Sequence, residues 1–371
     1  MGQERKVNSM ASNANIYPLP IQMDGLSTPW LEAALQSWNP GISLRDSEIV
    51  DVNNGTCTKV RMHLDLDEAG KAAGIPESVI VKGGFEAHSR LMHDMHGQEV
   101  HGYADVAPHT PLRMPACFFA GYDAQAQQGI VIMEDLVARG VEFLHPQKPQ
   151  RPELVAKRLS RLAQHHAMTY GRPGEFAPGG RFGWATHTAD STHFDSILVP
   201  DVWKSYIDSA RGAAASVCFH DLDWMVRANR RVGAFAKAQP PVLVHGDTHL
   251  GNLYIDVDGE PGFFDSLPHI SAAMQEITYH ITNALDVPDR RAHERTLVAH
   301  YRYELASYGV EVPSLDELMR QFGIFLANGY MIFIVNASEF QPEAINTAYT
   351  GRYSSAMLDH DTIGLIEGLG D

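Results

Sequence analysis

The chain has 371 residues, of which 44% are hydrophobic and 20% are charged, the composition of an ordinary water-soluble globular protein. A single hydrophobic core stops growing at roughly 250–300 residues, so we expect two lobes. The formal net charge of −16 argues against nucleic acid as a partner, because binding a phosphate backbone needs a basic face.

The sequence also bears on the compartment. The three cysteines, Cys57, Cys117 and Cys218, are scattered and form no CxxC motif, which favours a reducing environment. No run approaches 18 consecutive apolar residues, so we expect no membrane partner. Residues 1–14 are polar and lack the apolar centre of a signal peptide. We therefore expect a flexible N-terminus and a cytoplasmic location.

The first lobe, residues 15–136, is expected to be an antiparallel sheet with few helices. Thr28 to Trp38 has the pattern of a short amphipathic helix. Val60, Met62, Leu64 and Leu66 alternate with polar residues, the period of a half-buried strand, and an "NNGT" turn precedes them. The segments ESVIVKGG, ACFFAGY and GIVIMEDL resemble further strands, and residues 91–106 a helix.

The second lobe, residues 137–371, is expected to be mainly helical. Residues 153–167, 201–238 and most of the chain after residue 290 carry apolar residues at helical spacing. The strong β signal in this half is the stretch PVLVHGDTHLGNLYIDVDGEPGFFDS, residues 241–266. The fold class predicted from these patterns is α+β, with a sheet-rich first lobe and a helical second lobe.

That stretch predicts a hairpin with a magnesium site. Asp258-Gly259 is a preferred two-residue turn, and with this turn Asn252 would lie directly opposite Asp265. Directly opposed Cβ atoms are about 4.5–5.5 Å apart, a gap that one Mg²⁺ ion can bridge with few protein ligands. The register could also differ by one residue, because Pro261 cannot donate a hydrogen bond to a ladder.

Asp247 follows the apolar strand PVLV and lies five residues before Asn252. Phosphoryl transfer needs a carboxylate that accepts the proton of the attacking hydroxyl and is distinct from the metal ligands. Asp247, Asn252 and Asp265 supply this set. His245 is interpreted as a support of the turn, and His249 either orients Asp247, approaches phosphate or is structural.

The motif LVHGDTHLGNLYID…GFFD resembles the HGDxHxxN…D signature of the aminoglycoside phosphotransferase and choline kinase-like superfamily, which has a protein-kinase-like fold. By its wider pattern the chain is most similar to the ecdysteroid-kinase-like (CHK-like) small-molecule kinases. The resemblance spans about residues 40–360. It implies that Asp247 is the catalytic base and that Asn252 and Asp265 bind Mg²⁺.

The resemblance also implies a nucleotide site in the first lobe. Lys82 closes the strand VIVK and Glu99 follows 17 residues later, as in the Lys–Glu pair that holds the phosphates of ATP. Glu134 and Leu136 would offer backbone groups to adenine. The turn that covers the phosphates would use the amides around Gly55 and Thr56, although this turn has one glycine where protein kinases have three.

One departure concerns the segment after Asp265. Related sequences commonly read DWQ and continue to a Gly and an Asp that leads a helix, whereas this chain reads DSLPHISAAMQEITYHI, with Glu276 near the position of that Asp. The predicted metal ligand is retained, but the floor of the site differs.

The function predicted from the sequence is transfer of the γ-phosphate of ATP to a hydroxyl of a small molecule. An inactive kinase-like nucleotide-binding protein is the main alternative. A metallophosphoesterase, which needs Asp, His and Asn ligands from separate loops at two metals, is a less favoured alternative, and the histidines between residues 88 and 109 do not complete a zinc ligand set. The acceptor stays open between a hydrophobic alcohol and a cationic one. Aromatic residues that could line its pocket are Trp184, Trp203, Trp224, Tyr330 and Phe340.

Overall fold

The computed structural model describes residues 15–192 and 194–370, and the chain divides into two compact units. Unit 1 comprises the residues up to Glu142 together with Asp256–Pro268. Unit 2 comprises Phe143–Ile255 together with the residues from His269 onward. The segment Asp256–Pro268, which we had expected in the second lobe, thus belongs to unit 1. Arg113 holds it there: its Nη1 lies 2.7 Å from Asp256 Oδ2.

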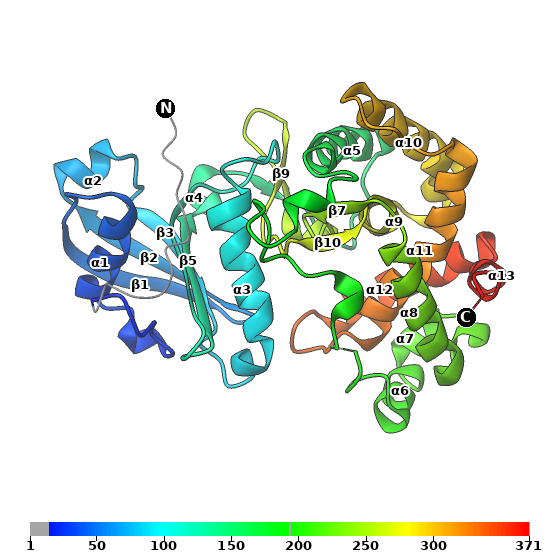
Figure 1. Cartoon of the computed structure of the whole chain (residues 1–371). Coiled ribbons are helices and arrows are strands. Elements are labelled where there is room, and N and C mark those ends of the chain that lie inside the picture. Colours follow the sequence, from blue (N-terminus) through cyan, green and yellow to red (C-terminus); the bar gives the residue numbers. More distant parts are fainter. Residues whose placement is uncertain (1–14, 193, 371) are drawn as a thin grey trace. The chain divides into compact units, whose positions relative to one another are not determined.

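Unit 1 is built on a five-stranded antiparallel sheet (Figure 1). The strand order is β1-β2-β3-β5-β4, so neighbours in the sheet are mostly neighbours in the chain. The strands are β1 (Leu44–Asn53), β2 (Thr58–Leu66), β3 (Ser78–Gly83), β4 (Cys117–Asp123) and β5 (Gln128–Glu134). The strands predicted from alternation and apolar runs are confirmed.

Each face of this sheet is covered by a helix (Figure 1). The apolar positions of β2, such as Val60 and Met62, point to the face where helix α1 (Thr28–Trp38) packs with Trp30 and Leu35. The opposite face carries Val131 and Met133, which pack against residues of α3 (His93–His101) and of the π-helical turn Gly102–Val106. The polar residues of β2 lie on this second face, and burial of the first face fixes the register.

The other elements of unit 1 are short. They are α2 (Glu68–Ala72), α4 (Leu136–Arg139), β9 (Pro261–Phe263) and the single turns Met23–Gly25 and Ser89–Met92, and the two-residue strand β6 (Glu142–Phe143) lies where the units join along the chain.

The turn before β9 differs from the prediction. The N–H of Gly259 donates to the carbonyl oxygen of Asp256 at 2.8 Å, and the N–H of Asp256 donates to the carbonyl oxygen of Glu260 at 2.9 Å. Gly259 has a φ of +81°, so this is a three-residue loop with a bulged glycine. The two-residue turn from which we derived a direct opposition of Asn252 and Asp265 is not formed.

Unit 2 is mainly helical, as expected. Its helices are α5 (Pro152–Ala167), α6 (Pro200–Ile207), α7 (Ala210–Ala214), α8 (Leu222–Lys237), α9 (Ala273–Ala284), α10 (Val287–Ser307), α11 (Leu315–Val335), α12 (Glu343–Asp359) and α13 (Thr362–Glu367). Strands β7 (Pro241–Val244) and β10 (His269–Ala272) pair antiparallel, and β8 (Leu253–Ile255) follows the short turn Leu250–Asn252.

Helix α11 forms the centre of unit 2. By length and composition it could cross a membrane, with a mean hydropathy of 1.4 over its most apolar window. However, 78% of that window is buried inside the protein, which is the pattern of a core helix. Phe322, Phe325 and Phe333 of this helix are almost completely buried.

Candidate active site

In unit 1, Lys82, Glu99 and Asp265 form one buried cluster. Lys82 is on β3 and Glu99 is on α3, which covers the same face of the sheet. Lys82 Nζ lies 2.6 Å from Glu99 Oε1 and 2.9 Å from Asp265 Oδ1. The Lys–Glu pair that the resemblance implies is therefore formed.

The charges of this cluster depend on one another. Burial alone would lower the pKa of Lys82, but Asp265 and Glu99 outweigh it and hold the pKa well above its usual value. Burial would likewise raise the pKa of Asp265, yet Lys59 and Lys82 hold it far below its usual value. For Glu99, burial is the dominant effect and raises the pKa. At neutral pH, Asp265 and Lys82 are thus both charged.

Asp265 has a backbone conformation that is rare for a residue with a side chain. Its φ is +54°, in the left-handed region, which Asp and Asn tolerate better than most residues but which still costs energy. The ion pairs with the two lysines offset this cost. A strained non-glycine residue in a charged cluster is a common property of functional sites.

The predicted phosphate-covering turn, residues 54–57, lies between β1 and β2. His88 Nε2 lies 3.0 Å from the carbonyl oxygen of Gly55 and so ties this turn to the segment before α3. Gly55 and Thr56 are both partly exposed. Their backbone amides are thus located at a surface that a ligand can reach.

The predicted adenine-binding segment follows β5. The N–H of Glu134 donates to the carbonyl oxygen of Ala116 at 2.8 Å, and the carbonyl oxygen of Leu136 accepts from the N–H of Gly140 at the end of α4. The N–H of Leu136 is in a first helical turn and has no partner within the helix, so it is a group that a ligand could use. Asp135, between Glu134 and Leu136, is fixed by Arg61 at 2.8 Å.

In unit 2, the predicted base Asp247 is held through both of its carboxylate oxygens. Asn252 Nδ2 donates to Asp247 Oδ2 at 2.8 Å and to the carbonyl oxygen of Asp247 at 3.1 Å. The hydroxyl of Tyr279, on α9, donates to Asp247 Oδ1 at 3.0 Å. His249 Nε2 lies 3.6 Å from Oδ2, longer than a hydrogen bond. The Asp247 side chain is nonetheless 27% exposed, so it is open to a proton donor.

The loop that carries Asp247 is fixed from below by Glu276. Its carboxylate accepts the N–H of Gly246 at 2.8 Å and the N–H of His245 at 3.2 Å. His166 Nε2, on α5, lies 2.8 Å from the same carboxylate. Burial would raise the pKa of Glu276, but the bonds from His166 and from the backbone lower it to about 2. Gly246 has a φ of +92°, which requires a glycine.

A second buried contact supports the same loop. His280 Nδ1 lies 3.0 Å from the carbonyl oxygen of Thr248, and Arg158 Nε donates to His280 Nε2 at 3.1 Å. Burial lowers the pKa of His280 to about 3. The ring is therefore neutral, so Nδ1 carries the proton and donates to Thr248.

The donor chemistry of Asn252 and Asp265 fits Mg²⁺, which prefers oxygen ligands and retains several waters. Asn252 directs its amide nitrogen to Asp247, which leaves Oδ1 as the atom for a cation. Asp265 offers a carboxylate and belongs to unit 1, whereas Asn252 belongs to unit 2. Each unit thus contains one of the two predicted Mg²⁺ ligands. Over residues 15–192 and 194–370, no group of three or more His, Cys, Asp or Glu could hold a metal ion.

The contacts of Tyr279, Glu276 and Lys59 were not predicted from the sequence. Lys59 Nζ lies 2.7 Å from Asp265 Oδ2. Tyr279 follows Glu276 by three residues, so on a helix both side chains share a face. That spacing could have indicated that Tyr279, three residues after the carboxylate that binds the loop, also contacts the loop.

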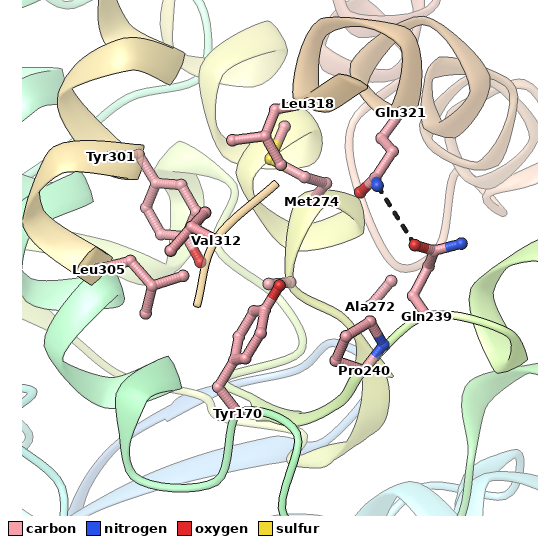
Figure 2. Close-up of a pocket in the computed structure, with 11 residues that line it drawn as sticks. Tyr170, Gln239, Pro240, Ala272, Met274, Tyr301, Leu305, Val312, Leu318 and Gln321 are labelled. Atoms are coloured by element: carbon pink, nitrogen blue, oxygen red, sulfur yellow. Dashed lines mark hydrogen bonds between the residues drawn. The ribbon is translucent and has the colours of Figure 1, made fainter. Parts of the chain in front are cut away.

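The aromatic residues proposed for an acceptor pocket are mostly core. Trp203, Trp224 and Tyr330 are buried. A pocket in unit 2 between Tyr170, Met274 and Tyr301 (Figure 2) has a free volume of about 10 Å³, room for roughly one water molecule. Gln321 donates to Gln239 at 3.2 Å beside it. This pocket is too small for a substrate.

Residues 96–265 match the phosphotransferase enzyme family, APH. This segment includes Glu99, Asp247, Asn252 and Asp265. No curated protein matches the chain by sequence.

Several solved structures resemble the chain. A candidate aminoglycoside phosphotransferase from Ralstonia eutropha has a TM-score of 0.50 and 12% identity, over 89% of this chain and 97% of that one. Choline kinase from Cryptosporidium parvum gives 0.48 and 10%, over 90% and 92%. Spectinomycin phosphotransferase with ADP and spectinomycin gives 0.46 and 13%, over 90% and 98%. At these sequence identities the similarity concerns the fold alone. It rests on the first of the three structures, whose TM-score is 0.50.

Residues 96–265 thus match a phosphotransferase family in line with the resemblance inferred from the sequence, and the chain shares the fold of the first of these structures.

Proposed function

We propose that this protein transfers the γ-phosphate of ATP to a hydroxyl group of a small molecule. The observation that carries the proposal is the Lys82–Glu99 ion pair at 2.6 Å beside Asp265. The desolvation of a buried ion pair can exceed its Coulomb attraction, so such a pair is weak evidence for a role in stability and is compatible with a functional one. In kinase-like enzymes such a lysine contacts the phosphates of ATP.

Each unit has its own part in the proposed reaction. In unit 1, the carbonyl of Glu134 and the N–H of Leu136 would bind the adenine edge, and Lys82 would hold the phosphates under the turn at Gly55 and Thr56. In unit 2, Asp247 would accept the proton of the acceptor hydroxyl as its oxygen attacks phosphorus. The oxygen–phosphorus bond to ADP then breaks, and ADP leaves with the electron pair.

Asn252 and Asp265 would hold the cation. When bound, Mg²⁺ supplies positive charge that neutralises the phosphate oxygens. The remaining catalytic work is positioning: the bonds from Asn252 and Tyr279 fix the Asp247 carboxylate before substrate arrives, which avoids reorganisation during the reaction.

The test is an ATP-consumption screen of the purified protein over apolar and cationic alcohols, with ATP and GTP and with the Asp247→Ala variant as control. We expect one alcohol class to stimulate nucleotide consumption and to yield a phosphorylated product. In Asp247→Ala this activity should fall by at least about 10³-fold, while nucleotide still binds. Wild-type turnover in Asp247→Ala, on a verified substrate, would show that Asp247 is not the base.

A further inference from the structure

Two lysines of unit 1 share one carboxylate. Lys59 on β2 and Lys82 on β3 are direct cross-strand partners, so their side chains leave the same face of the sheet. Lys59 Nζ lies 2.7 Å from Asp265 Oδ2, and Lys82 Nζ lies 2.9 Å from Asp265 Oδ1. Like charges directly opposite each other destabilise a sheet, and here an anion between them offsets the repulsion.

The two lysines differ in their freedom to move. The Lys82 side chain is 8% exposed and has a second carboxylate partner in Glu99. The Lys59 side chain is 35% exposed, and among the described residues its only carboxylate partner is Asp265. Its other contact is the ring of Phe264, at 5.7 Å from the centroid. Lys82 is thus fixed, whereas Lys59 can leave Asp265 by moving one exposed side chain.

Lys59 is also next to the predicted phosphate-covering turn. It follows residues 54–57 by two positions, at the start of β2. Its ammonium therefore belongs to the same end of the strand as the backbone amides of Gly55 and Thr56. Asp265 is the carboxylate partner of Lys59, so a cation on Asp265 would leave the Lys59 ammonium free to pair with another anion.

We propose that Lys59 is a second phosphate-binding lysine, held on Asp265 in the free protein and transferred to the polyphosphate of the nucleotide when Asp265 binds its cation. This inference rests on the proposed function and adds a residue and an order of events to it. Release of Lys59 couples the binding of the cation to the binding of the nucleotide, so each of the two strengthens the binding of the other.

The test measures the binding of ADP, inorganic tripolyphosphate and adenosine to the full-length protein, in Mg²⁺ and in a chelator. With Mg²⁺ present, Lys59→Met should weaken ADP and tripolyphosphate binding by about tenfold or more, the effect of one charged hydrogen bond. Adenosine affinity should not change. In chelator the loss should shrink to about threefold or less, because a buried Asp265 without a cation retains its lysine.

Two further variants serve as controls for charge and for surface position. Lys59→Arg keeps a cation that binds phosphate and should retain most of the ADP affinity. Lys71→Met, on α2, removes an exposed lysine of the same unit that pairs with Glu77 at 3.7 Å, and should bind ADP like the wild type. Thermal midpoints without ligand verify that each variant is folded.

The outcomes separate this inference from the proposed function. An unchanged ADP affinity in Lys59→Met, or an equal loss for adenosine and ADP, would overturn the second-lysine proposal. Lys82→Met should lose ADP binding in either case. If Lys82→Met and Lys59→Met both bind ADP as the wild type does, the proposed function itself fails.

Discussion

At the scale of single residues, the candidate base is unusually constrained. Both oxygens of Asp247 accept a hydrogen bond from a residue of the same unit, one from Asn252 and one from Tyr279. The Tyr279 ring stacks on Phe333 at 5.7 Å with an interplanar angle of 10°. Burial and the neighbouring Asp247 raise the pKa of Tyr279 well above its usual value, so its hydroxyl keeps the proton that it donates.

Tyr279→Phe tests this constraint because it removes the hydroxyl and keeps the stacked ring. We expect kcat to fall about tenfold, in line with the loss of one hydrogen bond to a charged group, with KM for ATP nearly unchanged. Tyr353→Phe is the matched control: it is a buried tyrosine of the same cluster, and its hydroxyl bonds to the carbonyl oxygen of Tyr279 at 3.3 Å. Equal kcat values for both variants would show that Tyr279 does not position Asp247.

The sequence predicted the residues of the site better than their contacts. Lys82 and Glu99 were paired because the resemblance implies a lysine on the third strand and a glutamate on the following helix. The bond from Tyr279 to Asp247 spans 32 residues and depends on how α9 packs under the loop. The Lys59–Asp265 pair depends in the same way on a strand register and on a left-handed backbone at residue 265. Local sequence patterns contain no information about how a helix packs under a loop or about which strand positions and backbone conformations bring two distant residues together.

At the scale of elements, helix α9 supports the loop that carries Asp247. The sequence departs from its relatives after Asp265, and Glu276 stands near the position where they carry an Asp. The structure shows this carboxylate bonded to the N–H groups of His245 and Gly246. The departure therefore retains an acceptor for the loop, and His166 Nε2 contacts the same carboxylate at 2.8 Å.

Glu276→Gln should destabilise the protein in a way that depends on pH. The pKa of Glu276 is lowered from 4.5 to about 2, so its charged form contributes stability above pH 4.5 that is lost as the pH falls toward 2. A lowering of this size corresponds to about 3 kcal/mol. Unfolding free energies of wild type and variant should differ by this order at pH 7 and converge at low pH. A difference that stays constant with pH would contradict the assignment.

Most elements were predictable because one face of each is buried. Alternation located β2, and helix α1 has the predicted bounds. The turn before β9 was not predictable, because Asp258-Gly259 fits both a two-residue turn and a three-residue loop. Arg113, distant in sequence, contacts both Asp256 and Asp258 of this loop, and no local pattern contains that contact.

At the scale of the whole molecule, both units bury neutral histidines. Burial is the main cause that lowers the pKa of His96 in unit 1 to about 4, and those of His165 and His280 in unit 2 to about 3. In the unfolded chain each would have a pKa near 6.5. Unfolding below this pH therefore takes up protons.

The protein should consequently lose stability as the pH falls below about 6.5. A histidine whose pKa is lowered on folding contributes stability above 6.5 that disappears between that pH and its folded pKa. Each of the three costs up to about 1.4 kcal/mol per pH unit in this window. Calorimetric midpoints at pH 7, 6 and 5 check this, with His96→Leu as a variant that removes the dependence from unit 1. Constant midpoints would argue that these rings are not neutral in the folded protein.

The central claim is that Asp247 acts as a base on a nucleotide that Lys82 holds. The most direct measurement compares Mg·ATP binding and turnover in wild type, Asp247→Asn and Lys82→Met on one verified acceptor. Our account predicts that Asp247→Asn binds Mg·ATP within about threefold of wild type but loses at least about 10³-fold in kcat, whereas Lys82→Met loses binding. Retained turnover in Asp247→Asn, or unchanged nucleotide binding in Lys82→Met, would contradict it.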